Sequence, residues 1–250
     1  MPSGLYMSAA GANAQNLRLQ VLSNNLANVQ TVGYKPQQAV MQARFAELIE
    51  RGEVVPGTGG AEDIGGGVTI QPVVTQYGEG TLQSTGNKTD FAINDGSSFF
   101  VIQRGGKEFL TRAGNFTFDS AGQLVTSQGE AVLDAGGRPI AIDPTLPYSV
   151  LNGGRIQQGD LMQSLMLARP KQLEQLQHLG GNLFQTTEEY DTLRGGDRPV
   201  VSGYIEQSGV QPTTAMMELI EASRVYEANA RMIQNHDSVV GSLISRVLQS

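Results

Sequence analysis

The carboxy-terminal stretch, 213–250, carries the most regular pattern of the sequence and constrains the fold most. Its side chains recur at alternating steps of four and three residues, which is the a/d spacing of a coiled-coil seam. No proline follows Pro212 to interrupt it. The pattern predicts a long helix over 213–250, whose seam comprises Leu219, Ser223, Tyr226, Ala230, Ile233, Asp237, Val240, Ile244 and Val247. Asp237 is charged on a mostly apolar seam and is a candidate for fixing the packing register.

The amino-terminal stretch, 1–35, predicts a second helix with one apolar stripe. The β-branched residues and glycine of 31–33 favour its end. A helix with a single stripe is marginal in isolation, so we expect the stripe to be buried. The stripe comprises Leu5, Ala9, Ala12, Leu19, Leu22 and Leu26.

The middle of the chain has a different character. Over 81–200, short β-rich runs alternate with glycine turns such as Gly105-Gly106, which is typical of an antiparallel β domain. The segment 36–80 is interpreted as an extended connection and 201–212 as the return connection. The predicted fold class is α+β, with long terminal helices in a coiled-coil layer and a central, mainly antiparallel β domain.

Two amphipathic ends on one β domain favour assembly. The terminal helices can pair with each other and with the same helices of neighbouring copies, and head-to-tail contacts of that kind build helical tubes. The alternative, which periodicity alone leaves open, is that both helices pack on their own domain.

Composition excludes several function classes. The net charge of −7 argues against nucleic-acid binding, which needs a basic face. The sequence has no cysteine, so neither disulfides nor thiolate metal sites are expected. It has no apolar run of about 20 residues, so no membrane insertion is expected. The first residues lack the features of a secretory signal, so export without a cleaved signal peptide is expected.

Residues that could carry chemistry are few. His236 and Asp237 are adjacent on a predicted helix, so their side chains diverge and cannot form a triad. The glycine clusters at 57–60 and 65–67 lack the Lys-Ser/Thr of a phosphate loop. We therefore expect no catalytic, cofactor-binding or metal-binding residues, and not an enzyme.

Residues 23–35 read Asn-Asn-Leu-Ala-Asn from position 24, then two residues, Thr, any residue, Gly, an aromatic and a basic residue. This segment resembles the amino-terminal signature of bacterial flagellar rod and hook proteins. The resemblance continues in the expected order through 80–93, 99–102, 110–119, 122–126, 180–187, 203–210 and 217–229.

The resemblance implies a structural subunit of the distal rod of the flagellar basal body, polymerising through its terminal helices into a drive shaft that transmits torque for motility. It also implies type III export, a periplasmic axial location, self-assembly with other rod and hook proteins, and contact with the P- and L-ring bushing. The candidate subunit-interface residues are Leu19, Leu22, Asn24, Asn25, Leu26, Asn28, Thr31, Gly33, Tyr34, Leu219, Tyr226, Ala230, Ile233, Val240, Ile244 and Val247.

Departures from the family pattern leave the subunit type open. The family usually has Ser-Asn-Val-Asn where this chain has Ser208, Gly209, Val210 and Gln211. The length suits a rod type, FlgG-like or FlgF-like; the register of 12–15 and 21–25 resembles the former, and the compact middle favours the latter. The alternatives are a proximal rod or hook subunit, a secreted β-domain binding module, or a peptidoglycan hydrolase.

Overall fold

The computed structural model describes residues 2–43, 68–70, 72–186, 189–193 and 198–248. Their contacts divide the chain into two compact units. A helical unit contains 1–26, 37–74 and 211–250, and a β unit contains 27–36 and 75–210. Both units are therefore built from segments that lie far apart in the sequence.

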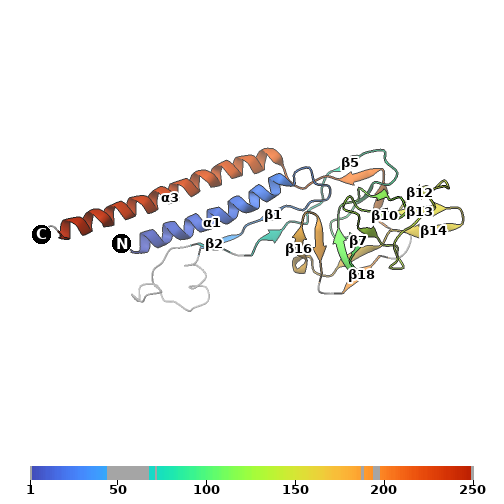
Figure 1. The fold of residues 1–250 in the computed structure, drawn as a ribbon, viewed down its shortest axis with the longest axis horizontal. Helices are drawn as coiled ribbons and strands as arrows, with labels where there is room; N and C mark the ends of the chain where they lie inside the picture. Colours follow the sequence, from blue (N-terminus) through green and yellow to red (C-terminus); the bar gives the residue numbers. More distant parts are fainter. Residues whose placement is uncertain (1, 44–67, 71, 187–188, 194–197, 249–250) are drawn as a thin grey trace. The chain divides into compact units, whose positions relative to one another are not determined.

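Two α-helices occur in the described residues, α1 (Pro2–Ala27) and α3 (Pro212–Leu248), and both contribute to the helical unit. The same unit holds β1 (Gln37–Gln38), β2 (Met41–Ala43) and β3 (Val68–Ile70), and β4 (Val74–Thr75) lies at its boundary. β2 pairs with β3 antiparallel, and β1 pairs with β4. Figure 1 shows α1 and α3 as the two long helices.

The β unit begins its strands with β5 (Leu82–Ser84), β6 (Phe91–Ile93), β7 (Phe99–Arg104), β8 (Lys107–Thr111), β9 (Thr117–Phe118), β10 (Leu124–Val125) and β11 (Ala131–Val132). It continues with β12 (Ser149–Leu151), β13 (Arg155–Gln158), β14 (Leu161–Ser164), β15 (Leu167–Pro170), the 3-10 turn η1 (Leu173–Gln175), β16 (Gln177–Gly180), β17 (Leu183–Gln185), β18 (Tyr190–Thr192), β19 (Val200–Ser202) and β20 (Tyr204–Glu206).

The largest sheet runs β16-β17-β8-β7-β11-β10-β9, with β15 joining β7 to β18. A meander β12-β13-β14 and the pairs β19-β6 and β20-β5 complete the unit. All of these pairings are antiparallel, which confirms the predicted character of the central domain. The predicted turn at Gly105 and Gly106 closes the β7–β8 hairpin, and both glycines have positive φ, as a two-residue hairpin turn requires.

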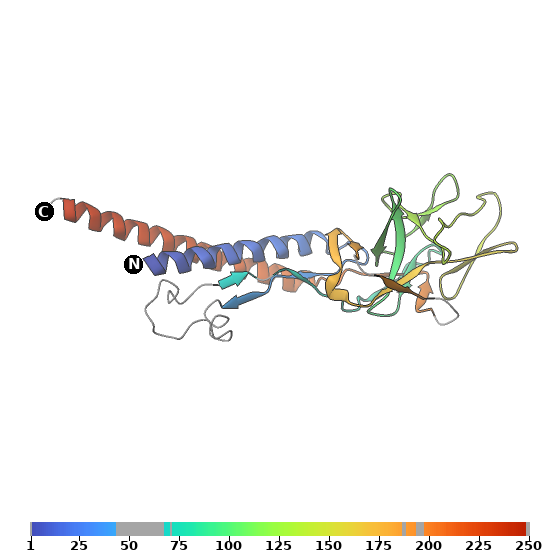
Figure 2. The same cartoon turned by 90° about the horizontal axis from the view of Figure 1, so that it is seen from below.

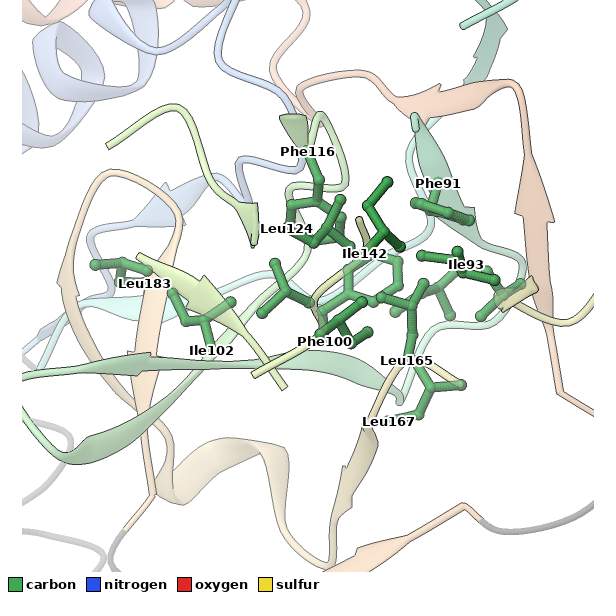
Figure 3. Packing of buried hydrophobic residues seen from close by; sticks show 14 residues of the cluster. Phe91, Ile93, Phe100, Ile102, Phe116, Leu124, Ile142, Leu165, Leu167 and Leu183 are labelled. Carbon is green, nitrogen blue, oxygen red and sulfur yellow. The ribbon is translucent and has the colours of Figure 1, made fainter. Parts of the chain in front are cut away.

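The core of the β unit is formed by alternating side chains. Phe100 and Ile102 of β7 face one apolar cluster, whereas Phe99 and Val101 face another, as the two-residue period of a strand dictates. In Figure 3, Phe100 and Phe116 point into the same cluster; their ring centroids lie 5.2 Å apart. The β unit therefore buries a full core within one chain.

Candidate functional site

The helical unit places α1 and α3 side by side, as the views in Figure 1 and Figure 2 agree. A Cβ added at Gly4 would lie 3.0 Å from the His236 ring, and one added at Gly11 would lie 3.2 Å from the Asn229 amide. From Gly4 to Gly11 along α1, the contacted residue on α3 changes from His236 back to Asn229, so the two helices run antiparallel. Glycine allows the backbone of α1 to approach both side chains this closely.

The face of α3 that packs within the chain follows a seven-residue repeat. Ala215 and Ala222 are buried and continue the spacing of Asn229 and His236. This face is rotated away from the centre of the predicted seam. An extended coiled-coil layer formed by the termini is not confirmed by this one pair.

Other residues of the predicted seam remain partly or largely accessible. Leu219, Ala230 and Ile233 are half-buried. Tyr226 and Val240 are exposed by 37% and 41%. Ile244 and Asp237 are exposed as well, and the side chain of Val247 lies outside the described residues.

Large apolar side chains on α3 remain exposed by 37–62%. We call them the exposed apolar face of α3. They include two seven-residue series, one through Val225, Met232 and Val239 and one through Tyr226 and Val240, which lie about 100° apart around the helix. Large apolar side chains left exposed in this number on one helix are typical of an interaction site. The face comprises Met216, Met217, Ile220, Val225, Tyr226, Met232, Val239, Val240 and Ile244.

On α1, the predicted interface residues differ in burial. Leu22 and Asn25 are buried, Leu19 and Leu26 are half-buried, and Asn24 is exposed. The amide of Asn25 donates to the carbonyl of Gln37 at 2.7 Å and accepts from its N–H at 3.0 Å. Asn25 therefore ties the end of α1 to the chain where it re-enters the helical unit.

The rest of the signature belongs to the β unit. We call residues 27–36 the signature loop. Thr31 donates from both its N–H and its hydroxyl to Asn28, at 3.1 Å each, which closes a turn after α1. Gly33 has φ +67 and its N–H donates to the carbonyl of Glu206 at 2.8 Å. A Cβ added at Gly33 would lie 2.4 Å from the backbone of Arg112, so no other residue fits there.

Tyr34 is fully buried in the β unit. Its ring meets the His178 ring edge-on at 6.1 Å between centroids, and His178 meets Phe184 in the same way at 5.1 Å. Burial lowers the pKa of His178 and outweighs the opposing effect of its hydrogen bond to the Gly181 carbonyl. Gly33 and Tyr34 thus contact their own chain extensively.

Lys35 and Glu206 form a buried ion pair. Their side chains are 1% and 2% exposed, and Lys35 Nζ lies 2.6 Å from Glu206 Oε1. Lys35 also donates to the Gly78 carbonyl at 2.6 Å, and Glu206 Oε1 accepts from the Gly80 N–H at 2.8 Å. Burial lowers the pKa of Lys35, and the charge and hydrogen bond of Glu206 act in the opposite direction. The bonded partner is what makes a charge at this depth tolerable.

Arg112 extends the charged cluster toward the surface. Its buried guanidinium lies 3.7 Å from carboxylate oxygens of both Glu206 and Asp95, and it stacks on Phe99 at 5.1 Å. Burial would raise the pKa of Asp95, but hydrogen bonds from Ser98, Arg169 and Ser97 together lower it. This cluster therefore contains two positive charges, on Lys35 and Arg112, and two negative charges, on Glu206 and Asp95, which cancel.

Gly209 explains one departure from the family pattern. A Cβ at this position would lie 2.8 Å from Cδ of Pro36, and the Gly209 N–H donates to the Tyr34 carbonyl at 3.0 Å. The Asn that the family usually carries there would collide with the proline ring unless the loop shifted.

Sequence reasoning missed Glu206, Arg112 and Asp95 as structural determinants. The sequence identifies Lys35 only as the basic residue that ends the signature. Its partner lies 171 residues away, and no periodicity connects two such positions. The one local signal for this ion pair is that Lys35 and Glu206 are opposite charges that directly follow the apolar residues Tyr34 and Ile205.

Neither α1 nor α3 combines the length and apolarity that a bilayer-crossing helix needs. No three His, Asp or Glu side chains among the described residues gather as metal ligands would.

Three family models match the chain. Residues 5–35 match the flagella basal body rod protein model, and residues 92–158 match the D1 domain of flagellar hook protein FlgE/F/G. Residues 201–246 match the carboxy-terminal region of flagellar basal body rod FlgEFG proteins. The matches include nearly all of the signature loop, much of the β unit and most of α3.

Whole-chain relatives agree with these models. The flagellar basal-body rod protein FlgF of Caulobacter vibrioides is 32% identical over 99% of this chain and 98% of its own length. The FlgG proteins of Bacillus subtilis and of Buchnera aphidicola (subspecies Schizaphis graminum) are 30% and 32% identical, over 98% and 97% of this chain and 99% of their own lengths.

These findings define the chain as a structural, non-enzymatic protein of the bacterial flagellum. More specifically, it belongs to the flagellar basal-body rod protein family. The predicted family is therefore confirmed, and the peptidoglycan hydrolase alternative does not fit the family.

Proposed function

We propose that this protein is a subunit of the basal-body rod that polymerises through its terminal helices into the axial drive shaft. The observation that carries the proposal is the exposed apolar face of α3. A helix this rich in exposed Met, Val and Ile gains free energy when further helices cover it.

The occupant that fits this face is another copy of the chain. Val225, Met232 and Val239 repeat every seven residues, as do Tyr226, Ile233 and Val240, and that spacing suits knobs-into-holes packing with helices. Because the two series point in different directions, we assign them to two different neighbours. Contacts of this heterologous kind extend a helical polymer.

The proposed subunit-facing residues are the accessible members of the predicted set, namely Leu19, Asn24, Leu26, Leu219, Tyr226, Ala230, Ile233, Val240 and Ile244. Val247, whose side chain lies outside the described residues, is kept in the proposal from its place in the sequence pattern alone. Leu22, Asn25, Asn28 and Thr31 adjoin them, and Gly33 and Tyr34 contribute by holding the signature loop in its own β unit.

Within the rod, we assign the protein to the distal segment, with a proximal rod or hook position as the alternative. Similarity to proteins named FlgG and to proteins named FlgF supports a rod position of either kind. The proposal includes type III export without a cleaved signal peptide, a periplasmic axial location and contact with the P- and L-ring bushing. Labelling this subunit in isolated basal bodies would reveal its order along the rod.

The test is a paired substitution on the exposed face, Met232→Glu with Val239→Glu, in a strain whose own copy is replaced. We expect the variant to fold with an unchanged melting temperature, to be absent from isolated basal bodies and to abolish swimming. Gln234→Glu, an exposed change on the same helix, is the matched control and should leave all three unchanged. Normal incorporation of the doubly substituted protein would contradict the proposal.

A further inference from the structure

Three of the four connections between the two units lead into one small region of the β unit. The unit boundaries fall after residues 26, 36, 74 and 210. The β-unit segments at or beside the last three of these boundaries are 33–36 of the signature loop, 76–80 and 206–209. We call these three segments together the junction.

Backbone hydrogen bonds join the three junction segments. The Gly33 N–H donates to the Glu206 carbonyl at 2.8 Å, and the Gly209 N–H donates to the Tyr34 carbonyl at 3.0 Å. The Gln76 N–H donates to the Pro36 carbonyl at 2.8 Å. The signature loop therefore lies between the other two segments and bonds to both.

Lys35 and Glu206 are the side chains that bridge the whole junction. Lys35, in the signature loop, donates hydrogen bonds to the Gly78 carbonyl and to the carboxylate of Glu206. The Glu206 carboxylate also accepts a hydrogen bond from the Gly80 N–H. Each group thus binds its charged partner and the backbone of 78–80. The bonds are directional, so they fix the relative positions of the three segments and do more than hold them together.

An apolar pair would be the simpler way to stabilise such a buried site. Buried ion pairs often contribute no more stability than apolar residues of similar volume, because both charges lose their hydration. The neighbouring Tyr34 and Val210 show that apolar side chains pack readily here. The ion pair instead specifies how the three junction segments are placed relative to one another, which an apolar pair would do less strictly.

We propose that Lys35 and Glu206 are positioning residues that couple the helical unit to the β unit by fixing the junction. The inference rests on the proposed rod function, in which the terminal helices form the shaft that transmits torque. Three of the four chain connections between the two units enter the β unit beside this pair, so it lies where force carried along the chain reaches that unit.

The first test measures amide hydrogen exchange in the purified full-length chain. Lys35→Met alone leaves Glu206 buried without its partner and can unfold the protein, so the informative variant is Lys35→Met with Glu206→Met. Lys107→Met, an exposed lysine of β8, is the matched control. We expect the double variant to raise exchange at the amides of 33–35 and 76–80 by about tenfold or more, with β7 and β8 unchanged. Unchanged protection in the junction, or an equal rise throughout β7 and β8, would overturn the inference.

The second test uses swimming in media of increasing viscosity, with each variant as the only copy in the cell. We expect the double variant to lose swimming speed severalfold relative to Lys107→Met at high viscosity, or to stay out of basal bodies although folded. Swimming at control speed would overturn the coupling role. If the unsubstituted chain is itself absent from basal bodies, the proposed rod function fails, while the exchange result still reports on the junction.

Discussion

The β unit and the helical unit differ in how far one chain completes them. In the β unit, Phe91, Phe100 and Leu124 have no exposed surface, and two clusters fill the interior. On α3, among the side chains that the structure describes, Ala215 and Ala222 alone are buried. The β unit therefore has the properties of an independent domain, whereas α3 has those of one part of a larger bundle.

The largest expected effect tests this difference directly. Phe100→Ala removes a ring from the centre of the β unit and should destabilise the monomer by about 3–5 kcal/mol. Met232→Ala, at an exposed position on α3, should change monomer stability by less than about 0.5 kcal/mol. Urea unfolding followed by fluorescence and circular dichroism measures both. Similar losses in the two variants would remove the distinction between the units.

A second prediction concerns the signature loop, which follows α1 yet belongs to the β unit. Gly33→Ala combines an unfavourable positive φ with a backbone collision, so it should cost about 3 kcal/mol or more. Gly86→Ala is the matched control, since Gly86 has φ +74 but no atom within 4 Å of an added Cβ. That variant should cost about 1–2 kcal/mol, the strain alone. Equal unfolding midpoints would show that the loop is not held against Arg112.

A third prediction sharpens the border between the units. Gly209→Asn should destabilise the protein by about 1–3 kcal/mol through overpacking against Pro36. Pro36→Ala should relieve part of that loss, so the two substitutions should be non-additive in a double-mutant cycle. Additive effects would mean that Gly209 and Pro36 do not constrain each other.

The smallest effect is a pH dependence within the β unit. His178 has an ordinary pKa of 6.5, which burial lowers in the folded protein. The unfolded chain therefore takes up a proton first as the pH falls below 6.5, and stability declines. His178→Phe keeps an aromatic contact with Tyr34 and Phe184 but cannot titrate, so its unfolding free energy should fall less between pH 6.5 and about 5. Parallel pH profiles would contradict this assignment.

Periodicity predicted the helices, and the contacts of α3 within the chain use a different face from the predicted seam. The four-and-three spacing indicated one long carboxy-terminal helix, and α3 covers Pro212–Leu248. It indicated a seam through Tyr226 and Val240, whereas the chain packs α3 through Ala215 and Ala222. When apolar residues extend around more than one face of a helix, spacing alone cannot select the face that packs inside.

The signature shows the same division at the level of single residues. The sequence indicated correctly that the chain turns at Gly33, because a glycine after a helix is a local signal. It could not show that Lys35 meets Glu206, because that contact exists only once β20 is folded beside the loop. Local signals were readable from the sequence, and tertiary ion pairs were not.

The composition of α1 has a consequence for how assemblies of this chain respond to their surroundings. Arg18 is the one charged side chain between residues 2 and 27, and glycine, alanine and amide side chains make up much of the rest. Contacts made by such a helix have little charge for dissolved ions to screen. The stability of these contacts should therefore be nearly the same at low and at high ionic strength, apart from salts such as sulfate, which strengthen apolar burial. On cooling the contacts should weaken, because the free energy gained by burying apolar surface falls as the temperature falls.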